Sequence, residues 1–566
     1  MRQRKHVRRT LGMALAASMT LSLCSVPAMA EENSEGTFDI TGCVLSEPHS
    51  IDPNISTGTD QRFYQVHMWE GLMKYSVGEE LAGTYDSMYL TTTEPGQAES
   101  YEVSEDELTY TFHLRDDIYW SDGEPVTAQD FVYSWQRIVD PELASSNGNI
   151  FNEIVLNATE INSGEMDPSE LGVEAVDDKT FVVTLENACP YFLELCVDPR
   201  LSPIRQDVVE EYGNEWTEAS NIVCNGPYTM TEWVHDGYIR LEKNEQYYNY
   251  EALGPDSITW YMNDSETAIL AAYQSGEYDF MTSIPTDQIS TLADSGDLFT
   301  NDKIGLYYLY LNVNHITDWR VRAAITLAID RQNIVENVTQ GGENPATGIE
   351  SAGITTYDGK LWTEEVGSPM TAWLQEMYPD YDLTNYEECC ELAMELLAEA
   401  EAEGYDTGVT LDYEYNTSES HKAIGEAIQS DLSGVLGIDI TLNNSDSSGY
   451  TANLALGEFD IGRLGYTISF DDPIGYLDLF GTNGSFEYAG WSSSEYDELV
   501  AQAKQMEDGA ERDEVMKEAE ALMFSENGFS ICPLYYYVFN YCMDDTIGNV
   551  GYTTLGFCTF AYATQK

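Results

Sequence analysis

The stretch YTFHLRDDIYWSDGEPVTAQDFVYSWQRIVDP, residues 110–141, contains a strand and a helix with well-marked ends. Polar and apolar residues alternate over 110–114, which is typical of a half-buried strand. After a Ser-Asp-Gly turn, Thr127 and Asp130 stand three apart, as in the capping box that begins a helix. A proline at the end of the stretch stops that helix. The predicted buried face of the helix consists of Phe131, Trp135 and Ile138.

The same two patterns recur along the chain. A hairpin is predicted over 228–241 around an Asp-Gly turn, and a strand at 306–313 precedes a helix capped by Asp318. Thr384 and Glu387 predict a capping box for a long acidic helix that stops at Gly404. Further strands are predicted at 411–415 and 438–442, on either side of another helix. This mixture, without a Pro-rich or Gly/Ser-rich linker, predicts interwoven α/β lobes.

The first thirty residues have the layout of a secretory signal peptide. A basic start is followed by an apolar run over 11–23 and by the small-residue triplet 28–30. The run is shorter than the roughly 20 residues needed to cross a bilayer, so we expect cleavage after Ala30 and an extracytoplasmic protein. Lipidation at Cys24 is the rival route, but Leu23 occupies the position where a small residue is expected.

The acidic balance of the chain excludes one class of partner. The sequence has 99 Asp and Glu against 25 Lys and Arg, a formal net charge of −74. Such a charge repels phosphate backbones, so no nucleic-acid partner is expected. The simplest interpretation of the acids is a well-solvated exterior, and an electrostatic trap for cationic ligands is the alternative.

Cysteines and catalytic motifs give mostly negative indications. The cysteines after residue 30 are odd in number and irregularly spaced, so at most one disulfide is expected, and the neighbours Cys389 and Cys390 lie in a helical pattern. Isolated histidines argue against a metal site, and neither a serine-hydrolase elbow nor a phosphate-binding loop is present. We therefore expect no enzyme activity, no cofactor and no metal. The acidic pair Asp471 and Asp472 is interpreted as a capped loop before a helix over 474–480.

Residues 110–141 closely resemble the signature region of solute-binding protein family 5, the oligopeptide and dipeptide receptors of bacterial ABC importers. Trp120, Gly123, Pro125, Thr127, Asp130 and Phe131 stand in their family places. The resemblance continues in SIDP at 50–53, EGL at 70–72, NGPYTMTEW at 225–233, VRAAITLAIDRQNIV at 321–335 and DIGRLGYTISFDDPIGYLDLF at 460–480.

This resemblance implies an α/β, periplasmic-binding-protein-like (type II) fold, with two main lobes joined by a hinge and an inserted third lobe. Lobe I would be discontinuous, lobe II would be inserted into it, and the hinge would lie near 306–314 and 524–533. The implied boundaries are 31–80, 204–308 and 526–566 for lobe I, 81–203 for lobe II and 309–525 for lobe III.

The resemblance also implies a ligand site between lobes I and III, where the ligand is added as a strand and held mainly through its backbone. The residues that correspond to the two facing edges are Thr57, Gly58, Thr59, Arg463, Gly465, Tyr466 and Thr467. Tyr466 stands where the family usually has tryptophan, so that the aromatic wall is kept but shortened.

Ser469 is the main departure from the family pattern. Peptide receptors place an aspartate there against the α-ammonium group of the ligand, whereas a hydroxyl supplies no counter-charge. We expect weaker selection for a free amino terminus, which Asp471 or Asp472 would compensate.

The implied function is capture of oligopeptides for an ABC importer, with the membrane permease as protein partner and the receptor as a monomer. Two alternatives remain open. The same architecture could bind a non-peptide solute such as an oligosaccharide, which the abundant tyrosines would suit, a muropeptide or a metal chelate. The other alternative is a secreted hydrolase.

Overall fold

The computed structural model describes residues 37–56, 61–80 and 88–566. The chain divides into two units, Met1–Thr37 and Phe38–Lys566, and all elements described below belong to the second unit. The predicted signal peptide, Cys24 and the predicted site residues Thr57, Gly58 and Thr59 lie outside the described residues.

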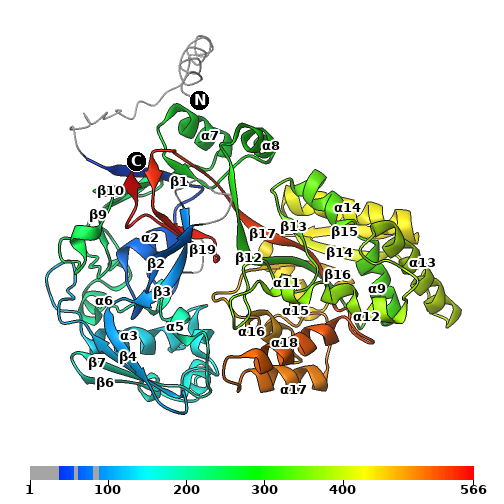
Figure 1. Cartoon of the computed structure of the whole chain (residues 1–566), viewed down its shortest axis with the longest axis horizontal. Helices are drawn as coiled ribbons and strands as arrows, with labels where there is room; N and C mark the ends of the chain where they lie inside the picture. Colours follow the sequence, from blue (N-terminus) through cyan, green and yellow to red (C-terminus); the bar gives the residue numbers. More distant parts are fainter. Residues whose placement is uncertain (1–36, 57–60, 81–87) are drawn as a thin grey trace, which may run out of the picture. The chain divides into compact units, whose positions relative to one another are not determined.

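An eleven-stranded mixed sheet runs through much of the second unit (Figure 1). Its order is β15-β14-β16-β12-β17-β11-β1-β10-β9-β8, and β13 pairs with β17 beside this path. Some neighbours in the sheet, such as β1 with β10 and β11 with β17, come from distant parts of the sequence, so the sheet ties the chain together. Its strands are β1 (Asp39–Val44), β8 (Tyr228–Val234), β9 (Tyr238–Lys243), β10 (Ser257–Met262), β11 (Phe280–Met281), β12 (Phe299–Leu311), β13 (Asn344–Pro345), β14 (Leu411–Asn416), β15 (Ile440–Ser445), β16 (Ile461–Tyr466) and β17 (Ile531–Met543).

The two central strands, β12 and β17, are each 13 residues long and pair antiparallel with each other. One end of β12 pairs with β16, and one end of β17 pairs with β11, so these two strands join the two halves of the sheet (Figure 1). Their register shifts between Asp302 and Leu306. The predicted strand at 306–313 is confirmed and begins earlier, at Phe299.

The remaining strands form three smaller sheets. The antiparallel sheet β4-β5-β7-β6 contains the predicted strand of the 110–141 stretch. The other two have the orders β2-β3-β19-β20 and β18-β21. Their strands are β2 (Met73–Glu80), β3 (Met88–Pro95), β4 (Ala98–Val103), β5 (Thr109–Leu114), β6 (Val173–Asp177), β7 (Thr180–Thr184), β18 (Ile547–Gly548), β19 (Val550–Thr553), β20 (Phe557–Thr559) and β21 (Thr564–Gln565).

The helix predicted after Thr127 is confirmed as α3 (Ala128–Val139). Both halves of its capping box are present, because the Thr127 side chain accepts from the N3 backbone and Asp130 accepts from the Thr127 backbone. The predicted inner residues are fully buried, and the helix ends at Val139, before the Asp-Pro pair. Phe131, Trp135 and Ile138 pack in a separate hydrophobic cluster with Phe112 of β5 and Phe181 of β7.

The other helices flank the sheets. They are α2 (Arg62–Met68), α4 (Ala158–Asn162), α5 (Phe192–Leu195), α6 (Gln206–Tyr212), α7 (Glu266–Ser275), α8 (Thr286–Ser295), α9 (Trp319–Ala328), α10 (Arg331–Asn333), α11 (Trp362–Val366), α12 (Pro369–Met377), α13 (Tyr386–Ala402), α14 (Glu419–Leu436), α15 (Ser447–Leu456), α16 (Ile474–Leu477), α17 (Ser494–Ala503) and α18 (Ala510–Met523). Short turns of other helix types are η1 (Gly148–Phe151), η2 (Pro168–Glu170), η3 (Pro199–Leu201), η4 (Gly213–Glu215), η5 (Tyr250–Ala252), η6 (Ile334–Thr339) and η7 (Asp478–Phe480).

One predicted helix start is wrong. The capping residue of α13 is Asn385, whose side chain accepts from the backbone N–H of Glu387. Thr384 cannot serve as the cap because its hydroxyl and its backbone N–H both donate to Asp382 in a tight polar turn. The predicted cap Asp318 of α9 is confirmed.

All nine cysteines that the structure describes are free thiols, and only Cys390 is not buried. The sequence allowed at most one disulfide among them, and Cys389 and Cys390 lie within α13 as expected. Burial raises the pKa of these thiols, to about 11 for Cys43 and to about 12 for Cys224. Hydrophobic packing rather than cross-linking therefore holds the described part of the chain together.

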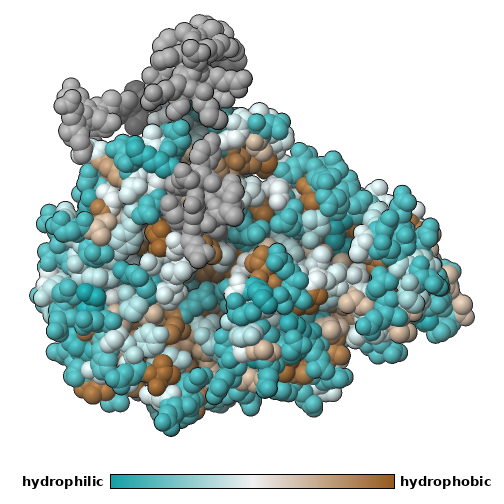
Figure 2. All heavy atoms as spheres, in the orientation of Figure 1, coloured by the Kyte–Doolittle hydropathy of each residue, from teal (hydrophilic) through white to brown (hydrophobic). Residues whose placement is uncertain are grey.

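The outer face seen in Figure 2 is mainly hydrophilic, with apolar residues in scattered patches. That distribution fits a chain with 99 acidic residues. Over the described ranges, every helix is too short or too polar to cross a bilayer.

Candidate functional site

Strand β16 carries three of the predicted site residues, Arg463, Gly465 and Tyr466, within the large sheet. It lies between β12, with which it pairs along its length, and β14, which pairs with it only at Ile461 and Gly462 (Figure 1). Beyond Gly462, no described strand lies on the β14 side. Such an edge presents unpaired main-chain groups to whatever lies beside it.

Gly465 is the position where that edge is open. The carbonyl of Arg463 accepts a hydrogen bond from the Tyr450 hydroxyl, and therefore points away from β12. In an antiparallel pair the direction alternates, so the N–H and carbonyl of Gly465 point to the same open side. A Cβ at Gly465 would collide with the hydroxyl of Tyr537, which explains the glycine.

Arg463 is a buried cation in aromatic surroundings. Its guanidinium lies 5.4 Å from the ring centre of Tyr307 and 5.9 Å from that of Tyr450, and its Nε donates to Asn416 at 2.9 Å. His421 lies against Tyr307, and burial, with Arg463 as a smaller cause, lowers its pKa to about 4. The imidazole is thus neutral at pH 7. Arg463 forms no ion pair with any described residue, so a ligand anion could approach it.

Tyr466 and Thr467 extend the same edge and are both half-buried. The ring of Tyr466 lies 4.5 Å from that of Phe486, between ring centres, and its carbonyl accepts from the Tyr476 hydroxyl at 2.9 Å. Thr467 lies beside Gly305 of β12, where a Cβ would come within 3.1 Å of the threonine hydroxyl oxygen. The predicted aromatic wall is therefore held in place by its own neighbours.

Ser469 faces a cation. Its hydroxyl oxygen accepts from Nη2 of Arg200 at 3.0 Å, and both side chains are half-buried. Arg200 also pairs with the buried Asp198, and Arg62 lies 3.6 Å from the same carboxylate. These two guanidinium groups and one carboxylate leave a net positive charge beside Ser469. Ser469 thus lacks the carboxylate that the family places there and also lies beside a positive charge, so an ammonium group is not expected to bind there.

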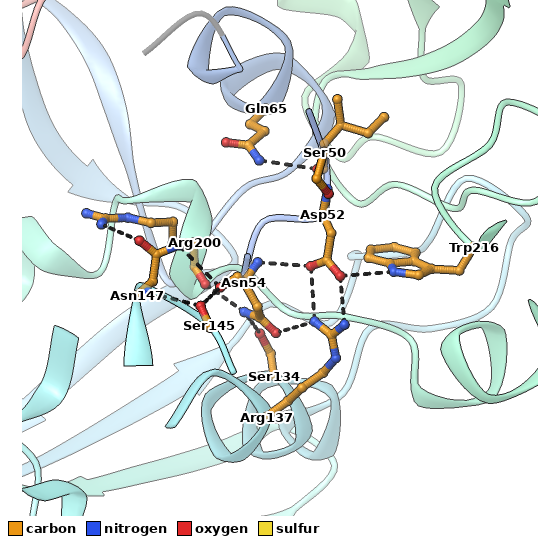
Figure 3. A network of polar contacts seen from close by, with 11 residues as sticks. Ser50, Asp52, Asn54, Gln65, Ser134, Arg137, Ser145, Asn147, Arg200 and Trp216 are labelled. Carbon is orange, nitrogen blue, oxygen red and sulfur yellow. Dashed lines mark hydrogen bonds and ion pairs between the residues drawn. The ribbon is translucent and has the colours of Figure 1, made fainter. Parts of the chain in front are cut away.

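Arg200 connects Ser469 to a polar network around residues 50–56, the segment that precedes the predicted residues Thr57 to Thr59 (Figure 3). Asp52 receives two hydrogen bonds from Arg137, at 3.0 and 2.7 Å, and one from the indole of Trp216 at 3.1 Å. The backbone carbonyl of Asn54 is held by Ser145 and Asn147. The segment is fixed up to the point where the described residues end.

Asp471 and Asp472, the acidic pair noted in the sequence, have different roles. Asp472 is buried, receives 2.7 and 2.9 Å hydrogen bonds from Arg512, and accepts the N–H of Ile474 at the start of α16. The capped-loop interpretation is confirmed for it. Asp471 accepts from the backbone and hydroxyl of Thr355 and forms no ion pair with a described residue.

Sequence reasoning missed Arg200 and also Glu194, whose carboxylate accepts the backbone N–H of Asp471 at 3.0 Å. The sequence offered one signal for Arg200, which is that basic residues are rare in it, 25 against 99 acids. Nothing distinguishes Glu194 from the other acids in sequence. No group of three or more His, Cys, Asp and Glu side chains in the described ranges could hold a metal ion.

Known proteins resemble this chain over nearly its whole length. It is 31% identical to the dipeptide-binding protein DppE of Bacillus subtilis over 545 residues, 94% of each chain. It is 30% identical to the oligopeptide-binding protein OppA of the same organism over 95% of each chain. Among solved structures, Haemophilus influenzae OppA in complex with RPPGFSPFR matches with a TM-score of 0.74 and 28% identity, over 94% of this chain and 99% of that one.

The family described as bacterial extracellular solute-binding proteins, family 5 Middle, matches residues 92–488. This range includes β16, Ser469 and the 110–141 stretch. The match spans more than half of the chain and agrees with the relatives above. The resemblance stated from the sequence, with its type II periplasmic-binding-protein-like fold, is therefore confirmed, and the chain belongs to the bacterial extracellular solute-binding proteins of family 5.

Proposed function

We propose that this protein is the extracytoplasmic receptor of an ABC importer, that it captures peptides beside β16, and that it delivers them to a membrane permease without changing any covalent bond. The observation that carries the proposal is the open edge of β16 at Gly465. An extended peptide can add to such an edge through main-chain hydrogen bonds, whatever its side chains are. The named relatives DppE and OppA support the ligand class.

Arg463 supplies the charge for one end of the ligand. It is 8% exposed, lies two residues from Gly465 on the same strand, and has no acidic partner among the described residues. A carboxylate of the ligand could accept a charge-assisted hydrogen bond from the Arg463 guanidinium, and such a bond is roughly twice as strong as a neutral one. The neutral His421 beside it can donate or accept without adding charge.

The lobes are assigned as the sequence implied: 31–80, 204–308 and 526–566 form lobe I, 81–203 form lobe II, and 309–525 form lobe III. Strands β12 and β17 connect the two halves of the large sheet and are the natural hinge. We propose that Thr57, Gly58 and Thr59, which the resemblance assigns to the lobe I edge and which lie outside the described residues, complete the site. A ligand that contacts both edges binds the closed form better and shifts the equilibrium toward it.

The test is calorimetric titration of the purified protein with a panel of peptides, preceded by native mass spectrometry to identify any ligand carried through purification. Peptides with a free carboxyl terminus should bind more tightly than the same peptides with an amidated terminus. In Arg463→Gln the affinity for the free-carboxylate peptides should fall about 10- to 100-fold and the difference should disappear.

Arg320→Gln is the matched control, since Arg320 on α9 pairs with Asp318 and with Glu403 at the end of α13, and neither partner lies on β16. It should leave every affinity unchanged. Binding of an oligosaccharide or a metal chelate with no peptide binding would favour the alternative receptor, and turnover of any peptide would replace the proposal with a hydrolase.

A further inference from the structure

A cavity of about 510 Å³ lies beside Asp471, and the described residues that line it include three carboxylates and no cation. The acids are Glu194 from α5, Asp302 from β12 and Asp471 after β16, and we call this space the acidic cavity. Threonines and tyrosines form much of the remaining wall. Its volume falls in the range of small-molecule pockets, roughly 300–1,000 Å³.

None of the three carboxylates forms an ion pair with a described residue. Glu194 accepts only the backbone N–H of Asp471 at 3.0 Å. Asp471 accepts from Thr355 at 2.6 and 2.8 Å, and Asp302 accepts from the Asn344 amide at 3.4 Å. Backbone and amide or hydroxyl donors hold these side chains in position, and no cation of the described residues pairs with them.

The cavity wall also holds a buried polar group without a partner. Thr553 of β19 lines the cavity and is 3% exposed, and among the described residues its hydroxyl has no hydrogen-bond partner. Leaving such a group unpaired is unfavourable, so a buried hydroxyl is normally satisfied by something. The Thr553 oxygen is itself shielded from solvent, so a donor that enters the cavity would meet the acids first.

The electrostatics favour a positive occupant. Burial, with the neighbouring Asp471 as a smaller cause, raises the pKa of Glu194 to about 8, and burial raises that of Asp471 to about 6. Glu194 is therefore largely protonated in the empty protein near pH 7, and a cation that entered the cavity would favour the ionised form of both acids. No group of three His, Cys, Asp or Glu side chains in the described ranges could hold a metal ion, whereas a cavity of this volume has room for an organic cation.

The two charged regions next to β16 thus have opposite signs. At Ser469 the nearest charge is the Arg200 guanidinium, whereas two residues later Asp471 opens onto the acidic cavity. We infer that the acidic cavity receives an ammonium or guanidinium group of the ligand, with Glu194 and Asp471 as its principal anions. The inference rests on the proposed function, under which the group is a lysine or arginine side chain of the captured peptide.

The experiment compares peptides of one length that differ only by lysine or norleucine at a single internal position, titrated into the whole protein by calorimetry. The lysine peptide should bind at least 10-fold more tightly at the position that enters the acidic cavity. In Glu194→Gln and in Asp471→Asn this preference should fall below threefold, while the norleucine affinity stays within threefold. A glutamine at 194 can still accept the Asp471 N–H, and thermal melts verify that each variant is folded.

Glu174→Gln is the matched control, because it removes one negative charge from the exposed face of β6 and should keep the full lysine preference. Equal binding of the two peptides at every position, or an unchanged preference in both cavity variants, would overturn the inference. If no peptide binds at all, the proposed function has failed, and spermidine then serves as the probe. Spermidine binding that Glu194→Gln abolishes supports the cavity as a cation site, and no spermidine binding overturns it.

Discussion

Two groups of acids in this protein, one buried and one half-buried, have opposite kinds of surroundings. In the network of Figure 3, Asp52 is 3% exposed and is matched by the Arg137 guanidinium, the Trp216 indole and the Asn54 backbone. In the acidic cavity, Glu194 and Asp471 meet backbone and hydroxyl donors but no cation from the described residues. The fold itself supplies the counter-charge of Asp52, whereas a counter-charge for Glu194 and Asp471 would have to come from a ligand.

The contrast separates structural from functional charge. A buried ion pair with all its hydrogen bonds made holds segments together and has nothing to offer a ligand. Unpaired carboxylates beside a cavity reduce the stability of the empty protein, and that reduction is recovered only when a cation binds. Variants in the two groups should therefore change the free energy of unfolding in opposite directions.

The largest effect is expected for Arg137→Met. It leaves the buried Asp52 carboxylate without its cation, and we expect the free energy of unfolding to fall by about 3–5 kcal/mol. Urea denaturation followed by circular dichroism measures this. Adding Asp52→Asn to the same variant should recover part of the loss, because no buried charge is then left unpaired.

Lys422→Met is the surface control for this prediction. It breaks the exposed pair with Glu426 on α14, and a change of at most about 0.5 kcal/mol is expected. If the Arg137 and Lys422 variants lost similar amounts, the structural role of the Asp52 network would be refuted.

An intermediate effect of opposite sign is expected for Glu194→Gln in the absence of ligand. With a pKa of about 8 in the folded state against an ordinary 4.5, Glu194 keeps its proton when folded and loses it when unfolded as the pH rises through this window. Its contribution to stability therefore falls as the pH rises from about 4.5 to 8. The charged groups around it are Asp471 and Asp472, and Tyr75 lies close by.

Glu194→Gln removes this loss of stability with rising pH. The variant should be more stable than the parent protein by roughly 2 kcal/mol at pH 6, since each pH unit above 4.5 contributes about 1.4 kcal/mol, and equal to it below pH 4.5. Unfolding curves at several pH values provide the measurement. Parallel pH profiles for the two proteins would mean that Glu194 is not a destabilising acid in the empty state.

The smallest effect is expected for Trp216→Phe. It removes one of the hydrogen bonds to Asp52 but keeps the ring that packs against Trp69 and leaves the Arg137 pair intact. A loss of about 1 kcal/mol is expected in the same denaturation assay. A loss as large as that of Arg137→Met would mean that the charge pairing matters less than the hydrogen bonds.

Local patterns in the sequence predicted elements whose causes are local. The capping box at Thr127, the Asp-Gly hairpin turn and the Asp318 cap depend on residues a few positions apart, and each is present. The start of α13 was missed because two adjacent residues could each cap it, and hydrogen bonds from Thr384 to Asp382 decided between them.

The candidate site could be predicted only in part. Resemblance located β16 and Ser469 because these positions belong to a recognisable stretch of sequence. The charges that surround them come from contacts between residues 269 positions apart, for Arg200 and Ser469, and 277 apart, for Glu194 and Asp471. No pattern in one sequence reports such pairs, and in a chain with 99 acids a single glutamate attracts no notice.

The nine free thiols have a practical consequence for how this protein unfolds. Their raised pKa values mean that little thiolate forms near neutral pH, so alkylating reagents should react slowly while the core is intact. Since eight of them are buried, only loss of that packing would expose them together. The rate at which the thiols are modified would therefore report how often the fold opens, and added ligand should lower that rate.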